Sequence, residues 1–106
     1  MPAPPTEEST VAQAVQGYLD HLRVERGSSP HTIAAYRRDL RRYLTWLGTR
    51  EITTLDQVTA PDVADFAGDL RESSLAPASA ARIVVAVSSL HRFAVDDGLT
   101  GSDPAR

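Results

Sequence analysis

The sequence contains no cysteine and no lysine, and six of its 106 residues are aromatic. The missing cysteine excludes a disulfide scaffold, thiol catalysis and zinc-finger sites. No apolar run approaches the ~18 residues of a membrane span, and the polar, proline-rich start is unlike a signal peptide, so a cytoplasmic protein is expected. A chain of this length predicts one compact domain and excludes an enzyme with separate substrate and cofactor lobes.

Signatures of enzyme chemistry are missing as well. There is no glycine-rich phosphate loop, no nucleophile elbow and no two-histidine zinc helix. The three histidines, His21, His31 and His91, are dispersed along the chain. A lone histidine beside arginine is more often a surface or phosphate-contacting group than a metal ligand. The sequence therefore predicts no metal, no cofactor and no self-sufficient active site.

Residues typical of helix starts and helix ends recur along the chain after a short leader. Residues 1–9 hold three Pro and two Glu with no apolar anchor, which predicts a disordered leader. Beyond it, capping residues and prolines precede apolar runs of helical spacing, and glycines follow them. Four helices are therefore expected, between Thr10 and Gly27, at 28–47, at 59–72 and at 75–95.

The expected helix ends rest on specific residue types. Ser, Thr, Asp and Asn side chains satisfy free backbone N–H groups at a helix start, and glycine adopts the left-handed conformation that ends a helix. Caps are expected at Thr10 with Gln13, at Ser29 before Pro30 and at Thr59 with Asp62, and stops at Gly27, Gly48 and Gly98.

Apolar residues recur at helical spacing in each segment, and no strand-like alternation competes with them, which predicts an all-α fold. The tyrosines Tyr18, Tyr36 and Tyr43 fall at core spacings, so we expect packing residues with hydroxyls at the rim. In the irregular link 49–58, the residues expected to reach the core are Ile52, Leu55 and Val58.

The net charge of −3 argues against a nucleic-acid partner until it is divided by segment. Segment 28–47 carries four Arg and one Asp, 75–95 carries two Arg and no acid, and 59–72 carries one Arg and four acids. At about 100° per residue, the arginines of 28–47 fall mostly opposite the apolar stripe. Guanidinium groups on such a face suit phosphates and guanine edges; the alternative is a solvated arginine face.

Two helix surfaces add to this pattern. Segment 28–47 begins Ser-Ser-Pro-His-Thr, whose free N–H groups, hydroxyls and imidazole suit a phosphate. Segment 75–95 carries small residues around Arg82, which permit close approach to a base edge; a central helix buried on all sides explains them equally well. The acids of 59–72 are interpreted as a solvated face that favours the helix start.

With these elements in place, the sequence resembles the N-terminal core-binding domain of Xer-type tyrosine recombinases, nearest to the XerD-like branch. Three segments carry the resemblance: residues 18–47 with their ERG–SP–HT–YRRDL run, the acidic segment 59–72, and 79–99 followed by 103–106. The resemblance implies a four-helix, SAM-like orthogonal bundle of two αα-hairpins. It also implies a DNA-binding domain over 10–98 and, at 99–106, the start of a linker to an absent catalytic domain.

In this family the second and fourth helices meet the major groove of a recombination half-site in double-stranded DNA. Carried over by position, the resemblance implies three roles. Ser29, His31 and Thr32 hold phosphates; Ala35, Arg38, Arg41, Ala78, Ser79 and Arg82 line the groove; Arg37, Arg42 and Arg92 make further phosphate contacts.

The family cleaves DNA with a tyrosine set among Arg, Lys and His residues, including a His-x-x-Arg pair that this sequence lacks. The chain is therefore expected to be non-catalytic by itself. Its parent is expected to exchange DNA strands through a 3′-phosphotyrosyl intermediate, to resolve chromosome dimers with a XerC-type partner, and to need no cofactor or membrane. Ser88 and Ser89 stand where relatives often carry a basic pair. The alternatives are the core-binding domain of a phage or transposon integrase, and a helical protein-interaction module.

Overall fold

The computed structural model describes residues 9–106, which contain four α-helices and one short 3-10 helix. Within this range the only strand-like pairing is a single bridge between Thr10 and Thr54. The predicted all-α fold is confirmed. Positions 1–8 of the predicted leader lie outside the described residues. The elements are α1 (Val11–Val24), α2 (Pro30–Thr49), η1 (Leu55–Gln57), α3 (Ala60–Glu72) and α4 (Pro77–Asp96).

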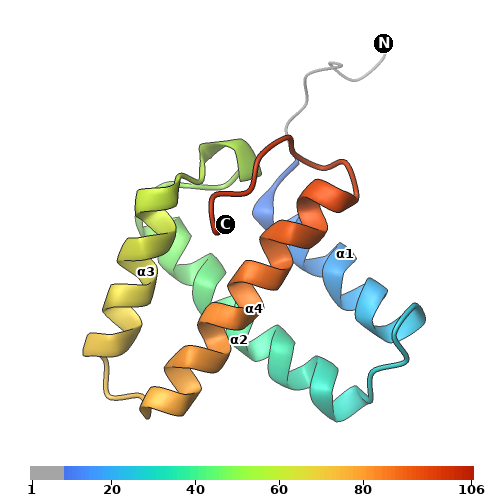
Figure 1. Ribbon diagram of the computed structural model, residues 1–106, viewed down its shortest axis with the longest axis horizontal. Helices are drawn as coiled ribbons and strands as arrows, with labels where there is room; N and C mark the ends of the chain where they lie inside the picture. Colours follow the sequence, from blue (N-terminus) through green and yellow to red (C-terminus); the bar gives the residue numbers. More distant parts are fainter. Residues whose placement is uncertain (1–8) are drawn as a thin grey trace.

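Two long helices, α2 and α4, cross near the middle of the molecule, with α4 in front in Figure 1. Helix α1 lies on one side of the crossing and α3 on the other, and α4 contacts all three other helices. The pairs α1–α2 and α3–α4 form hairpins whose connections lie along one edge of the molecule (Figure 1). This is the predicted four-helix orthogonal bundle.

The core lies between the crossing helices and takes side chains from every element. The predicted apolar stripe of α1 is confirmed, and Leu55 and Val58 are buried as expected, while Ile52 is half-buried. Burying these side chains stabilises the fold, because each large apolar group removed from water contributes about 1.5–3 kcal/mol. The largest of the fully buried side chains are Tyr43, Leu40, Leu47, Ile83, Leu90, His91, Val11 and Val87.

The predicted caps form, and one predicted stop is wrong. Capping boxes join Thr10 to Gln13 and Thr59 to Asp62, and the Ser29 side chain accepts from the Thr32 N–H. Gly27 and Gly98 have positive φ angles of 60° and 74°, as expected of helix stops.

The stop expected at Gly48 lies elsewhere, because α2 continues through Thr49. The left-handed residue is Glu51, with φ 59°. The carbonyl of Leu47 accepts from the N–H groups of both Arg50 and Ile52 at 3.0 Å, and the helix ends at Thr49, two residues later than the glycine suggests.

Helix α4 is the most apolar element of the fold. By length and composition it alone among the described helices could cross a membrane, a property that the sequence inspection did not anticipate. Its apolar side contributes to the core shared with α1, α2 and α3, which accounts for this composition. The buried residues are Ala80, Ile83, Ala86, Val87, Leu90, His91 and Ala94.

Hydrogen bonds tie both ends of the described chain to the link between α2 and α3. The Val11 N–H donates to the Thr53 carbonyl, and the Leu55 N–H donates to the Ser9 carbonyl. After α4 the chain turns back over η1 (Figure 1), where the Thr100 hydroxyl donates to Asp56 at 2.8 Å. The Ser9 end is thereby held on the side opposite the hairpin connections, whereas the C-terminal residues turn back toward the middle of the molecule (Figure 1).

Candidate functional site

The start of α2 is exposed, and its side chains are partly engaged with one another. Ser29 Oγ accepts from the Thr32 N–H at 3.1 Å, and the Ser29 hydroxyl donates to Thr32 Oγ1. Pro30 has no N–H to offer. Among the described residues only the His31 backbone N–H of the first turn therefore lacks a partner, which makes the phosphate site expected here smaller than the sequence suggests.

Four arginines of α2 form a continuous exposed surface, called here the arginine face. Their side chains point away from the core, as helical spacing predicts. The ion pairs found among residues 9–106 involve Arg23, Arg50 and Arg82, and none involves this face. Its positive charge is therefore not neutralised within the described part of the chain. The arginine face consists of Arg37, Arg38, Arg41 and Arg42.

The acid of the same helix, Asp39, points inward instead of offsetting these arginines. Asp39 is 4% exposed and accepts two hydrogen bonds from Arg82 of α4, from Nε at 2.9 Å and from Nη2 at 3.0 Å. Hydrogen bonding and charge attraction from Asp39 raise the pKa of the Arg82 guanidinium. Sequence inspection missed this pair. Helical spacing does indicate the burial of Asp39, because it puts Asp39 beside Tyr43 on the buried arc of α2, but it does not identify the partner on α4.

Helix α4 is buried on one side only. The two interpretations of its small residues, close approach to a base edge and a central helix buried on all sides, therefore each describe only part of it. Beside the core stripe, Arg82 keeps 51% of its side chain exposed and Val85 is 59% exposed. This exposed strip runs from Ala78 and Ala81 through Arg82 to Val85, with Ser79 half-buried at its edge. On α2, Ala35 is half-buried. The expected groove-lining residues of both helices are thus reachable from solvent.

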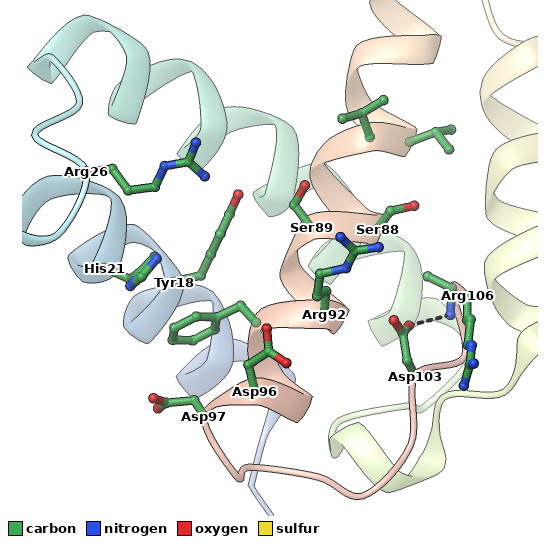
Figure 2. A pocket seen from close by; sticks show the side chains of 14 residues that line it. Tyr18, His21, Arg26, Ser88, Ser89, Arg92, Asp96, Asp97, Asp103 and Arg106 are labelled. Carbon is green, nitrogen blue, oxygen red and sulfur yellow. Dashed lines mark hydrogen bonds between the residues drawn. The ribbon is translucent and has the colours of Figure 1, made fainter.

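A groove of about 660 Å³ lies between α1 and α4 and is bounded by the segment after α4 (Figure 2). Arg92, predicted to contact phosphate, lines this groove together with Asp96 and Asp103. Carboxylates nearby lower the positive potential around a guanidinium. Arg92 is therefore less suited to an anion than the arginine face. The other polar residues lining the groove are Tyr18, His21, Arg26, Ser88, Ser89, Asp97 and Arg106.

Three of the four acids of α3 remain exposed, as expected, whereas Asp62 is half-buried, and three of the four also have structural partners. Asp62 completes the cap with Thr59. Asp69 accepts from Trp46 Nε1 at 2.7 Å, and Asp65 pairs with Arg50 at 3.3 Å. The contacts of Asp69 and Asp65 fasten α3 to the end of α2. The charge pattern of the sequence did not indicate this role.

Two sequence-based expectations about polar aromatic residues are wrong. His91, expected at the surface, and the hydroxyl of Tyr43, expected at the rim, are both fully buried, with Tyr43 Oη 2.7 Å from His91 Nε2. Burial lowers the pKa of His91 and raises that of Tyr43. Neither group reaches the arginine face. Among the described residues no three His, Asp or Glu side chains converge as metal ligands.

Comparisons with known sequences agree on one family. Residues 15–98 match the family described as phage integrase, N-terminal SAM-like domain. The tyrosine recombinase XerD of Mycobacterium tuberculosis is 47% identical over 104 residues, which cover 92% of this chain and 33% of that protein. XerC of Roseiflexus castenholzii is 40% identical over 92 residues, 87% of this chain and 29% of that protein. The chain thus spans about a third of the length of these relatives.

Solved structures show the same fold at lower identity. The N-terminal domain of a phage integrase/site-specific recombinase from Haloarcula marismortui superposes with a TM-score of 0.84 at 17% identity, covering 93% of both chains. Fragment 61–160 of a protein from Clostridium leptum superposes with a TM-score of 0.70 at 18% identity, covering 93% of this chain and 84% of the other.

Proposed function

The chain belongs to the phage integrase N-terminal SAM-like domain family and corresponds to the N-terminal part of XerD-like tyrosine recombinases; from this we propose that it binds duplex DNA through α2 and α4. In this proposal it is the non-catalytic domain that clamps one recombination half-site. Strand cleavage is assigned to a separate catalytic domain of the parent recombinase.

The observation that carries the proposal is the unpaired charge of the arginine face. Four guanidinium groups within six positions of one helix, with no acid of the described chain paired to them, repel one another. DNA phosphates relieve that repulsion, and each contact releases condensed counterions. Seven of the twelve acids of residues 9–106 lie on α3 or beside the groove of Arg92, so the surface is polarised although the net charge is −3.

The arrangement of the helices supports a shared contact surface. α2 and α4 cross, and both begin on the edge of the molecule that carries the hairpin connections (Figure 1). We assign phosphate contacts to Ser29, His31 and Thr32 and to the arginine face. Small residues at positions 35, 78 and 79 permit close approach to the groove. Arg92 is assigned a peripheral phosphate contact, weakened by Asp96 and Asp103.

The names of the relatives indicate the parent reaction. A tyrosine recombinase of the XerD type is proposed to act in the cytoplasm and to resolve chromosome dimers together with a XerC-type partner. In that setting the domain orients the duplex for its own catalytic domain and meets neighbouring recombinase subunits in the synaptic complex. No metal or cofactor is assigned to it.

Salt dependence of duplex binding tests the proposal. The logarithm of the binding constant is expected to fall with the logarithm of salt concentration by about 0.9 for each phosphate contact. Replacing Arg38→Ala and Arg41→Ala together should reduce this slope by about 1.8 if each guanidinium contacts one phosphate. Arg71→Ala, on the exposed side of α3, is the control and should leave the slope unchanged.

Two outcomes contradict the proposal. One is the absence of duplex binding by the 106-residue chain at low salt. The other is binding whose salt slope is the same in the wild type and in the Arg38/Arg41 double variant. Binding to a protein partner that does not depend on the arginine face would favour the interaction-module alternative instead.

A further inference from the structure

The contact between Asp39 and Arg82 differs from the two other ion pairs of the described chain. Arg23–Asp20 and Arg50–Asp65 are single contacts at 3.7 and 3.3 Å between exposed side chains. Asp39 has only 5% of its side chain exposed and holds Arg82 through two hydrogen bonds, at 2.9 and 3.0 Å. Such a bidentate contact between a carboxylate and a guanidinium group fixes the plane of the guanidinium group.

The guanidinium keeps one complete edge free. It carries five N–H donors, and Asp39 uses the Nε–H and one N–H of Nη2. Both N–H groups of Nη1 and the second of Nη2 remain. With 51% of the Arg82 side chain exposed, this Nη1–Nη2 edge is available to an outside acceptor pair.

Resting on the proposed function, we infer that Asp39 is a positioning residue that presents Arg82 to a guanine in the major groove. Guanine offers O6 and N7, two acceptors that match the free edge of a guanidinium. Asp39 itself touches no DNA in this arrangement. It acts by holding Arg82 in one orientation, so that little side-chain entropy is lost when the base binds.

The charge balance favours a base over a phosphate as the acceptor for Arg82. Asp39 neutralises Arg82 at contact distance, which weakens its attraction for a distant phosphate but leaves directed hydrogen bonding intact. The arginine face has no such partner and suits phosphates. The residues beside Arg82 are small, with Ala78 and Ala81 both exposed, so the guanidinium edge is not shielded by longer neighbours.

Selection of bound sites from random duplex DNA by the 106-residue chain tests the inference. The wild type should select guanine at one fixed position of its site. Asp39→Asn lacks the second acceptor and the charge that hold the guanidinium, so discrimination for that guanine should fall about 10- to 100-fold. Affinity for random duplex should be unchanged or higher, because one negative charge is lost beside the DNA surface.

Two further variants sharpen the result. Asp20→Asn removes a carboxylate paired with Arg23 on α1 and is the matched control, expected to leave site selection unchanged. Arg82→Lys keeps the charge but lacks the planar fork, so it should lose the same guanine preference as Asp39→Asn. If Asp39→Asn does not fold, Asp39→Glu takes its place, because it moves the carboxylate by one methylene and keeps the charge.

The outcomes separate this inference from the proposed function. Failure of the wild type to bind duplex DNA overturns the proposed function itself. DNA binding with a guanine preference that survives either the Asp39 variant or Arg82→Lys overturns the inference alone. Equal losses on selected and random duplex also overturn it, since they indicate a purely structural role for the pair.

Discussion

Replacing His91 by glutamine is expected to remove an acid-sensitive part of the stability of this domain. His91 has no exposed surface, and its Nε2 lies 2.7 Å from the Tyr43 hydroxyl, while Nδ1 has no partner among the described residues. Burial lowers the pKa of His91, an effect opposed in part by the charge of Asp103. The folded chain therefore holds His91 neutral at pH values where the unfolded chain protonates it.

The sign and size of the effect follow from proton binding. An unfolded histidine titrates near pH 6.5, and below this pH the unfolded state binds one proton that the folded state does not. Stability therefore falls as the pH falls from about 6.5 towards the lower pKa of folded His91. One proton gives a limiting slope of about 1.4 kcal/mol per pH unit, which corresponds to roughly 6–11 °C in Tm per pH unit for a domain of this size.

The assay is unfolding by urea, followed by circular dichroism, from pH 8 to pH 5. Glutamine does not titrate, and its amide can reach the position of Nε2 beside Tyr43, so His91→Gln should lose less stability than the wild type as the pH falls. His31→Gln is the control, because His31 is exposed at the start of α2 and its profile should parallel the wild type. Parallel profiles for the wild type and His91→Gln would refute the reasoning.

Three further changes test local features of the fold by the free energy of unfolding at pH 7.5. Tyr43→Phe removes the hydroxyl that His91 contacts and should cost about 1–3 kcal/mol, because a buried ring nitrogen loses its partner. Thr59→Ala removes the oxygen that accepts from the Asp62 N–H and should cost about 1 kcal/mol. Gly48→Ala should stabilise the domain by about 0.5–1 kcal/mol, because Gly48 is helical and an added Cβ meets no atom within 4 Å.

Each of these outcomes has a clear opposite. An unchanged stability in Tyr43→Phe would contradict the buried hydrogen bond, and an unchanged stability in Thr59→Ala would contradict the cap. A loss of stability in Gly48→Ala would indicate that this glycine ends α2, as the sequence alone suggests.

Helix starts were predictable because their chemistry is local. The Thr10–Gln13 and Thr59–Asp62 boxes each lie within four consecutive residues, and the side chains there have few competing partners. The end of α2 was not predictable in the same way. There the glycine signal at Gly48 competes with the half-burial of Ile52, whose N–H bonds to the Leu47 carbonyl and sets the turn at Glu51.

The arginine face was also predictable, since exposure opposite an apolar stripe follows from helical spacing alone. The two polar pairs between α2 and α4 were not. Asp39 and Arg82 lie 43 residues apart in the sequence, and Tyr43 and His91 lie 48 apart. Which side chains meet at such separations depends on the crossing of α2 and α4, and local patterns of charge or hydrophobicity do not report that geometry.

Both of these pairs join α2 to α4, which is the last of the four described helices in chain order, and this bears on how the domain folds. Until α4 docks, the carboxylate of Asp39 and the hydroxyl of Tyr43 have no partner in the interior, so a nascent chain ending before residue 77 gains little by burying them. Folding should then be all-or-none, with α1, α2 and α4 closing together. Amide hydrogens of α1 and α2 are accordingly expected to exchange with solvent only through global unfolding, at rates matching those of α4.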